Sequence, residues 1–196
     1  MTGTEAGAGP PVLHTERLAL RPFTAEDAND VRRLAGDREI AGGTLTIPHP
    51  YGPGVAEAWI ATHPEAYLRG EQVVFAVERR GDGALVGSVG LDIAPQHRSA
   101  ELGYWIGRPY WGSGFGTEAA ARVLAFGFAD LALNRISARC FARNPASGRV
   151  LEKLGMRHEG CGRGEILKWG VFEDIHHYAM LKAEFEAALA AGAGSR

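Results

Sequence analysis

The segment Ala100–Thr117 constrains the chain most, because it joins a strand pattern, a glycine-rich turn and the start of a helix. Its first part, Ala100–Ile106, is rich in aromatic and branched residues, which suit a half-buried strand. Glycines then stand at three alternate positions: Gly112, Gly114 and Gly116. Glycine allows the backbone to turn sharply and to approach a ligand closely. Apolar residues at helical spacing begin at Ala120, so we predict a strand–turn–helix unit.

A glycine turn that opens a helix is a potential anion site. The first N–H groups of a helix have no partner inside it, and the helix dipole adds positive potential. A Walker loop needs Lys-Ser or Lys-Thr after the last glycine, whereas Thr117 and Glu118 follow here. A dinucleotide fingerprint needs G-x-G-x-x-G within a βαβ unit, and this turn reads G-x-G-x-G in mid-chain. We therefore predict a site for a pyrophosphate, with a purely structural turn as the alternative.

The residues Trp-Gly-Ser-Gly-Phe-Gly at 111–116 resemble the acetyl-coenzyme A loop of the GNAT acetyltransferase superfamily, Q/R-x-x-G-x-G/A. Trp111 departs from the Gln or Arg of the general pattern. The longer form Tyr-Trp-Gly-x-Gly-(Phe/Tyr)-(Gly/Ala)-Thr-Glu-Ala is typical of the branch that acetylates ribosomal-protein N-termini, the Rim type. The opening Leu-His-Thr-Glu-Arg-Leu-Ala-Leu-Arg-Pro also resembles that branch. The resemblance extends from about Leu13 to Lys182.

The pattern of elements predicts an α+β fold. Strands first form an antiparallel meander and then cross through one long helix. The resemblance implies a GNAT-like mixed, mostly antiparallel sheet of about seven strands, with helices on both faces. It also implies that the fourth and fifth strands are parallel and splay apart, and that the pantetheine of coenzyme A lies in the gap. We expect a disordered tail over 1–11, a single acetyltransferase domain over 12–183, and a helix end and tail over 184–196.

Four local predictions bear on the site. The Pro- and Gly-rich segment Gly42–Gly54 is predicted to be a loop, and Val55–Leu68 a helix that Pro64 kinks or breaks. A second helix is predicted to begin after Asn144, which stands as its N-cap before Pro145. Two closing strands around a polar loop are predicted last, at Met156–Gly160 and Gly170–Leu181.

The composition excludes several classes of function. A formal charge of −2 over 196 residues gives no basic field for nucleic acid and no polybasic membrane patch. The chain opens with no charged segment followed by an apolar one, so we expect no export signal and a cytoplasmic protein. The two cysteines form no C-x-x-C pair. Adjacent strand residues point to opposite faces, so His176 and His177 cannot ligate one ion, and we predict no metal.

Acetyl transfer requires that the donor is held and its carbonyl polarised. We expect the backbone N–H groups of Ser113–Thr117 to hold the pyrophosphate. The backbone of Ile106 and Gly107 is predicted to contact pantetheine and the thioester oxygen. The full set of predicted cofactor-binding residues is Ile106, Gly107, Trp111, Gly112, Ser113, Gly114, Phe115, Gly116, Thr117, Asn144 and Ser147. The co-substrate implied is acetyl-coenzyme A.

Glu101 is the predicted general base, because it is the sole acidic residue on the central strand. The alternative is a structural glutamate satisfied by hydrogen bonds. In some N-terminal acetyltransferases the base lies on the fifth strand, where this chain has Arg139 at the matching spacing.

Ser147 is the second predicted catalytic residue, as a hydrogen-bond donor to the leaving sulfur. Asn144 and Ser147 resemble the family's Asn-x-x-Ser signature. The tyrosine that many members place in this helix as general acid is absent, and Arg149 and Val150 stand in its neighbourhood. Tyr104 is expected to be a core or pocket-wall residue.

Together these features predict an N-acetyltransferase that moves an acetyl group directly from acetyl-coenzyme A to an amine, by resemblance a protein N-terminus. We expect the acceptor to enter between the regions Gly42–Leu68 and Arg157–His177. Two alternatives stay open: an enzyme for a small amine such as an antibiotic or polyamine, and a non-catalytic acyl-coenzyme A sensor. The sequence leaves open whether the protein is a monomer or a homodimer.

Overall fold

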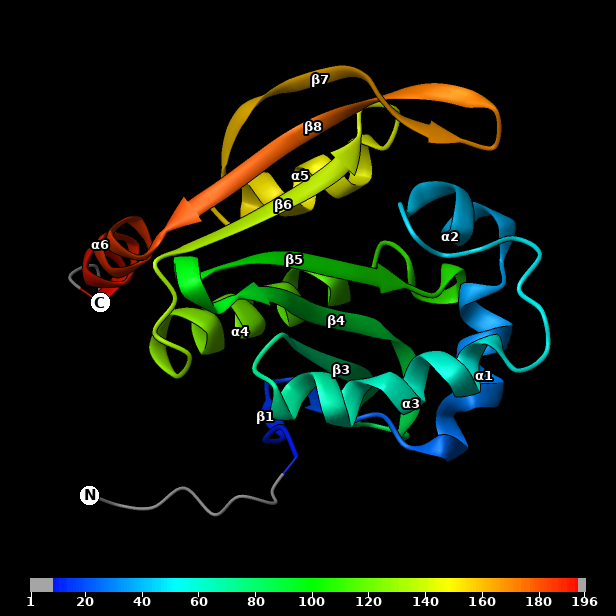
Figure 1. The fold of residues 1–196 in the computed structure, drawn as a ribbon. Coiled ribbons are helices and arrows are strands. Elements are labelled where there is room, and N and C mark those ends of the chain that lie inside the picture. Colours follow the sequence, from blue (N-terminus) through cyan, green and yellow to red (C-terminus); the bar gives the residue numbers. More distant parts are fainter. Residues whose placement is uncertain (1–8, 194–196) are drawn as a thin grey trace.

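The computed structural model describes residues 9–193, so the predicted tails lie partly outside the described residues, at 1–8 and 194–196. The described chain forms one eight-stranded sheet in the order β1-β2-β3-β4-β5-β6-β8-β7 (Figure 1). The strands are β1 (Leu13–His14), β2 (Leu18–Arg21), β3 (Gln72–Arg79), β4 (Ala84–Ala94), β5 (Ser99–Ile106), β6 (Arg135–Phe141), β7 (Arg157–Lys168) and β8 (Val171–Leu181). The short β1 is the strand beyond the seven predicted, and it pairs antiparallel with β2.

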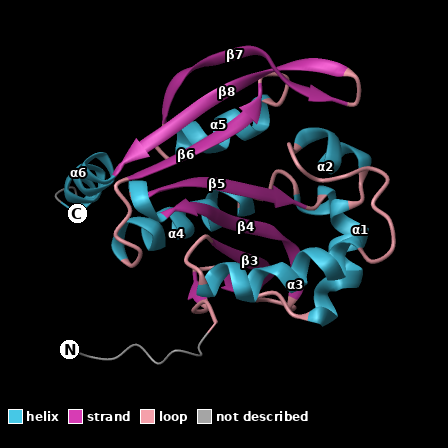
Figure 2. Ribbon diagram, viewed as in Figure 1, coloured by secondary structure: helices cyan, strands magenta, loops and turns pink. Residues whose placement is uncertain are grey.

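Helices cover both faces of the sheet, as predicted (Figures 1 and 2). They are α1 (Ala28–Ala35), α2 (Arg38–Gly43), α3 (Val55–Leu68), α4 (Phe115–Ala129), α5 (Pro145–Lys153) and α6 (Lys182–Ala193). Residues of α4 pack with Phe75 and Leu91 in one hydrophobic cluster, and residues of α1 and α3 pack with Trp105 in another. Burial of apolar side chains on both faces provides the main favourable term in folding.

Side chains of β5 alternate between the two faces. Leu102 and Tyr104 pack with the α4 cluster, whereas Trp105 packs with the α1–α3 cluster. Because strand side chains have a period of two, Glu101 and Gly103 lie on the same face as Trp105. The central strand therefore presents its predicted base toward α1 and α3, and Tyr104 toward α4 and α5.

The predicted splay lies between β5 and β6. These strands pair in parallel only where Ser99–Glu101 faces Arg135–Ser137. Beyond this point β6 stays paired with β8, and β5 stays paired with β4. The ribbon shows β5 and β6 separating toward their C-terminal ends (Figure 1). Beyond this point the backbone N–H and C=O groups on the two facing edges do not pair with each other. Buried N–H and C=O groups require hydrogen bonds, so these groups are left for another partner.

Three local predictions need correction. Helix α3 runs through Pro64 without a break, because the buried Ala56, Ile60 and His63 hold it against the sheet. The polar loop expected between the last strands is instead part of a long hairpin of β7 and β8, with shifts in register along it. Part of the predicted Gly42–Gly54 loop belongs to α2, which begins after Asp37, an N-cap whose side chain accepts from Glu39 N. None of the helices in residues 9–193 has the length and apolar character needed to span a membrane.

A buried histidine in α3 gives the fold a pH dependence. His63 is 9% exposed, and neither ring nitrogen has a hydrogen-bond partner among the described residues. Its ring packs edge-on against Trp59, with centroids 4.5 Å apart. Burial lowers the pKa of His63 from 6.5 to about 4, so the folded protein holds this ring neutral at neutral pH.

We expect this histidine to destabilise the fold in acid. The unfolded chain binds a proton near pH 6.5, whereas the folded chain binds it only near pH 4. Stability is therefore lost as pH falls through this window, by roughly 3 kcal/mol at its lower end. Urea unfolding at pH 7.5 and 4.5 should show a smaller acid loss for H63L than for the wild type. H97Q, at an exposed histidine, is the control, and equal losses in the wild type and H63L would contradict the assignment.

Candidate active site

The glycine turn before α4 has the backbone conformation that the motif predicts. Gly112 and Gly114 have φ of +75° and +81°, in the left-handed region that strains other residues. Gly114 is the N-cap of α4, and the first bond of the helix runs from Glu118 N to Gly114 O at 3.1 Å. The N–H groups of Phe115, Gly116 and Thr117 therefore precede the helical ladder. They lie at the N-terminus of a fifteen-residue helix, a position that favours an anion.

Glu118 and Arg17 fasten this turn to the start of the sheet. Arg17 Nη1 donates to Ser113 O at 2.9 Å, and its Nε donates to Glu118 Oε2 at 2.7 Å. Thr15 Oγ1 donates to the other oxygen of Glu118 at 2.5 Å. Burial raises the pKa of Glu118, but the hydrogen bonds from Thr15 and Arg17 outweigh it, so this pKa lies below its ordinary value. The Thr-Glu-Arg opening and the Thr-Glu after the glycines thus meet in one contact, which no local pattern predicted.

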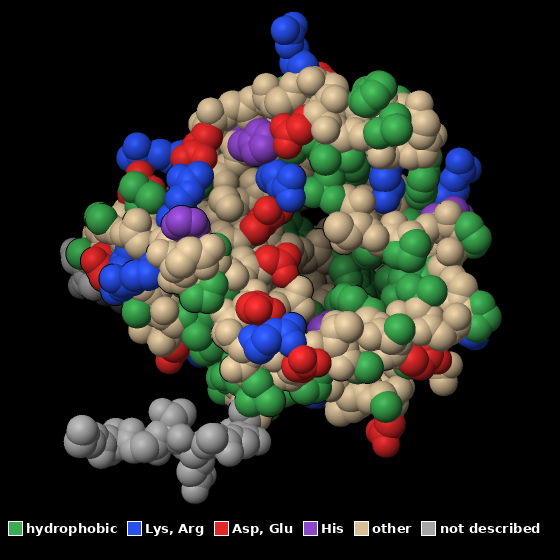
Figure 3. Space-filling view, viewed as in Figure 1, with side chains coloured by type: hydrophobic (Ala, Val, Ile, Leu, Met, Phe, Trp, Pro, Cys, Tyr) green, Lys and Arg blue, Asp and Glu red, His purple; other side chains and the backbone are tan. Residues whose placement is uncertain are grey.

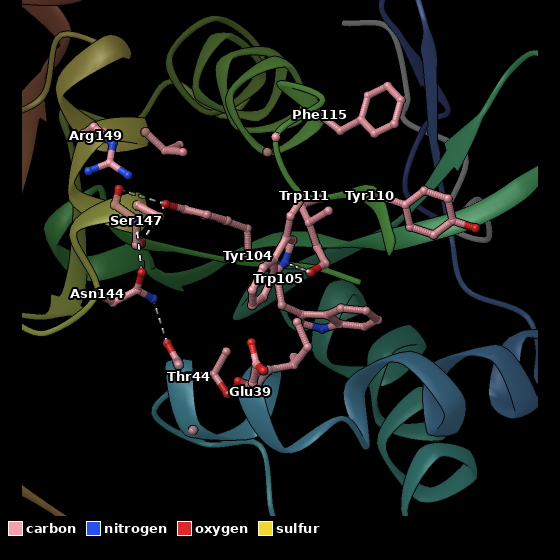
Figure 4. Close-up of a pocket in the computed structure, with 18 of the residues that line it drawn as sticks. Glu39, Thr44, Tyr104, Trp105, Tyr110, Trp111, Phe115, Asn144, Ser147 and Arg149 are labelled. Atoms are coloured by element: carbon pink, nitrogen blue, oxygen red, sulfur yellow. Dashed lines mark hydrogen bonds between the residues drawn. The ribbon is translucent and has the colours of Figure 1, made fainter. Parts of the chain in front are cut away.

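A cavity of about 780 Å³ lies against this turn (Figure 4). The predicted cofactor residues that line it are Ile106, Trp111, Gly112, Gly114, Phe115, Gly116, Thr117, Asn144 and Ser147. Ser113 and Gly107 do not line it. Four cationic side chains also line it, and two of them, Arg149 and Lys153, stand four residues apart on one side of α5. Arg143 also lines it but is held by Glu173 at 2.8 Å and by Gly42 O at 2.9 Å.

Gly107, which was predicted to contact the cofactor through its backbone, forms backbone hydrogen bonds within the chain. Gly107 N donates to Val86 O at 2.8 Å, and Gly107 O accepts from Tyr110 N at 2.9 Å, so both groups are used within the chain. Alternation along the strand then directs the backbone of Ile106 and Tyr104 away from β4, toward the gap. The carbonyl of Ile106 accepts from the Trp111 indole at 2.6 Å. The N–H of Ile106 and the backbone of Tyr104 are therefore the groups that face the splay.

A second cavity, of about 410 Å³, lies on the α1–α3 side of the sheet. The face drawn in Figure 3 is hollowed near its centre, with apolar side chains inside the hollow and charged ones beside it. Apolar walls include Tyr51, Trp59 and Phe141, and polar groups include Glu101 and Arg139. Residues 43–48 line it, but no residue of Arg157–His177 does, because strand β6 forms the opposite wall. Five residues are shared by the two cavities: Gly43, Thr44, Tyr104, Trp105 and Ser147.

Glu101 is held in this second cavity by a cation from the neighbouring strand. Arg139 Nε donates to Glu101 Oε1 at 2.9 Å, across the opening of the splay. Arg139 also lies 3.9 Å from Glu165, which in turn pairs with His177 at 2.6 Å. Arg139 occupies the position on the fifth strand where some N-terminal acetyltransferases have their base. Here it is the ion-pair partner of the predicted base, Glu101. A carboxylate has two acceptor oxygens, so Glu101 keeps acceptor capacity beside this ion pair.

Ser147 lies where the cavities join, in contact with Tyr104. The Tyr104 Oη and Ser147 Oγ are 2.8 Å apart, and Ser147 O lies 3.3 Å from the same phenol (Figure 4). Asn144 caps α5 as predicted, because its Oδ1 accepts from Ser147 N at 3.2 Å. Its Nδ2 donates to Gly43 O at 3.4 Å, linking α5 to α2. The contact of Tyr104 with Ser147 was not predicted, since only the three-dimensional register of β5 and α5 creates it.

Comparisons with known proteins agree with this geometry. Residues 17–157 match the model of the acetyltransferase (GNAT) domain family. The uncharacterized N-acetyltransferase YoaA of Bacillus subtilis (strain 168) is 32% identical over 173 residues, covering 88% of this chain and 97% of that protein. The ribosomal-protein-serine acetyltransferase of Escherichia coli (strain K12) is 25% identical over 116 residues, covering 59% of this chain and 64% of that protein.

A solved GNAT-family acetyltransferase from Bacillus anthracis superimposes with a TM-score of 0.79, at 27% identity over 89% of this chain and all of that one. The chain therefore belongs to the GNAT acetyltransferase family and is an N-acetyltransferase. The resemblance to the Rim-type branch is confirmed by a ribosomal-protein acetyltransferase among its relatives. In residues 9–193, no group of three or more His, Cys, Asp and Glu side chains is placed to hold a metal ion.

Proposed function

We propose that this enzyme transfers the acetyl group of acetyl-coenzyme A directly to an amine, and that the amine is a protein N-terminal α-amine. The observation that carries the proposal is the meeting of two cavities at the gap between β5 and β6. One cavity adjoins a helix start suited to phosphate, and the other contains a carboxylate. Donor and acceptor can thus approach one another from opposite faces of the sheet. The E. coli relative that acts on ribosomal-protein serine supports a protein acceptor.

The residues of the first cavity fit coenzyme A. The N–H groups of Phe115–Thr117 would hold the pyrophosphate, because the glycine turn leaves them outside the helical ladder. Arg149 and Lys153 line the same cavity and suit the remaining phosphate charge. The backbone of Tyr104 and Ile106 would meet the amides of pantetheine along the splayed edge. When bound, the coenzyme supplies an activated acetyl thioester.

The second cavity supplies the proton acceptor. Glu101 would take the proton from the attacking amine, directly or through a water molecule, while Arg139 fixes the orientation of its carboxylate. Asn144 and Ser147 would stand at the donor side of the gap, with the Ser147 hydroxyl able to donate toward the leaving sulfur. No side chain is required to form a covalent acyl intermediate, since both substrates can be present together.

Thiol release from acetyl-coenzyme A, measured across a panel of amines, tests this function. We expect peptides with a free N-terminus to support faster release than spermidine or an aminoglycoside, and N-acetylated copies of the same peptides to support none. Faster thiol release with a small amine would show that the acceptor is a small molecule and not a protein N-terminus. Binding of acetyl-coenzyme A without release for any amine would favour the sensor alternative.

A further inference from the structure

The partly buried Tyr104 carries a phenol at this junction for which no chemical role was predicted. It belongs to β5, lines both cavities and contacts α5 through Ser147. Burial raises the pKa of Tyr104 to about 12, an effect that its hydrogen bond to Ser147 reduces but does not cancel. The phenol is therefore protonated at neutral pH and can act as a hydrogen-bond donor.

Ser147 offers Tyr104 two acceptor atoms, its Oγ at 2.8 Å and its carbonyl oxygen at 3.3 Å. A hydroxyl carries one hydrogen and two acceptor lone pairs. If the phenol donates to Oγ, the hydrogen of the serine hydroxyl is free to point into the junction of the cavities. Such a chain of hydrogen bonds strengthens the terminal donor, because each bond polarises the next.

We propose that Tyr104 is a positioning residue that donates to Ser147 and thereby directs the serine hydroxyl toward the sulfur of coenzyme A. This inference rests on the proposed function. In the reaction the N–C bond forms and the C–S bond breaks, the amine proton passes to Glu101, and the electron pair of the broken bond stays on sulfur. The serine hydroxyl, aligned by Tyr104, stabilises that charge by a hydrogen bond. The pair thus supplies a hydroxyl donor in a chain whose α5 lacks the tyrosine that many members of the family place in this helix.

The test compares Y104F, S147A and the double variant. Y104F removes the donor and keeps the ring, and Y178F is the matched control. The Tyr178 hydroxyl is 3.4 Å from Glu152 Oε1, and the residue is buried beside α5 without lining either cavity. We expect Y104F to lower kcat about tenfold or more with little change in KM for acetyl-coenzyme A. The double variant should be no slower than S147A, because Tyr104 acts through Ser147.

A second readout needs no turnover. The pKa of the coenzyme A thiol in its complex can be followed by thiolate absorbance, with the desulfo-coenzyme A complex subtracted to cancel Cys140 and Cys161. We expect this pKa to be higher by about one unit in Y104F and in S147A than in the wild type and Y178F. An unchanged thiol pKa in Y104F, or additive losses of kcat in the double variant, would overturn the inference. Absence of turnover in the wild type would instead count against the proposed function, while the thiol titration would still decide the role of Tyr104.

Discussion

Replacing Glu101 by glutamine is expected to lower kcat by about 10²–10⁴-fold, the usual contribution of a general base. The amide keeps the size of the side chain and can still accept from Arg139, so the wall of the cavity should persist. Affinity for acetyl-coenzyme A should stay the same, because Glu101 lines only the second cavity. Timed assays of acetylated product measure kcat, and calorimetric titration of the same protein with acetyl-coenzyme A measures the affinity.

Glu165 offers the matched control for this prediction. It also approaches Arg139, at 3.9 Å, but it lines neither cavity. E165Q should therefore keep kcat within about twofold, since a half-exposed ion pair contributes little. A kcat for E101Q close to that of E165Q would show that Glu101 serves only the ion pair with Arg139, and another group would have to accept the proton.

Replacing Gly114 by aspartate is expected to weaken the binding of acetyl-coenzyme A by at least about 100-fold. Two effects combine: the φ of +81° strains any residue with a Cβ, and a carboxylate at the N-terminus of α4 opposes the phosphate charge. G114A carries the strain without the charge, so its affinity should lie between those of the wild type and G114D. Calorimetric titration of the three proteins, with thermal unfolding to confirm that each is folded, gives the comparison.

A glycine outside the site is the control for these variants. Gly81 lies in the exposed β3–β4 turn with open space around its Cβ position, far along the chain from α4. G81D adds the same charge to the protein and should leave the affinity for acetyl-coenzyme A unchanged. If G114D bound acetyl-coenzyme A as tightly as G81D does, the glycine turn would not be part of the phosphate site.

The parts of the site that could be predicted depend on local sequence. The alternate glycines impose the backbone of the turn, and Asn144 followed by Pro145 caps α5 as expected. The extra strand β1 has only two residues, Leu13 and His14, which is too short a run to show an alternating pattern. Pro64 led to the prediction of a kink or break, because the sequence shows the local penalty of a proline inside a helix. The packing of α3 that outweighs this penalty appears only in the structure.

The contacts that set the chemistry depend on how distant elements are placed. Arg139 meets Glu101 because β6 runs beside β5 before the splay, and Tyr104 meets Ser147 because α5 lies behind the gap. Gly107 was predicted to contact the cofactor from its place at the strand end. Its hydrogen bonds to Val86 and Tyr110 depend on the register with β4 and on the turn that follows β5, which no local motif encodes.

Backbone N–H groups at the start of α4 are proposed to hold the linked phosphates of coenzyme A and so to direct its thioester into the gap between β5 and β6. Calorimetry of the wild-type protein with acetyl-coenzyme A and with acetyl-pantetheine, which lacks the nucleotide and both linked phosphates, tests it most directly. We predict one equivalent of acetyl-coenzyme A bound at least about 100-fold more tightly than acetyl-pantetheine. Equal affinity for the two compounds, or no uptake of acetyl-coenzyme A by the folded protein, would contradict the account.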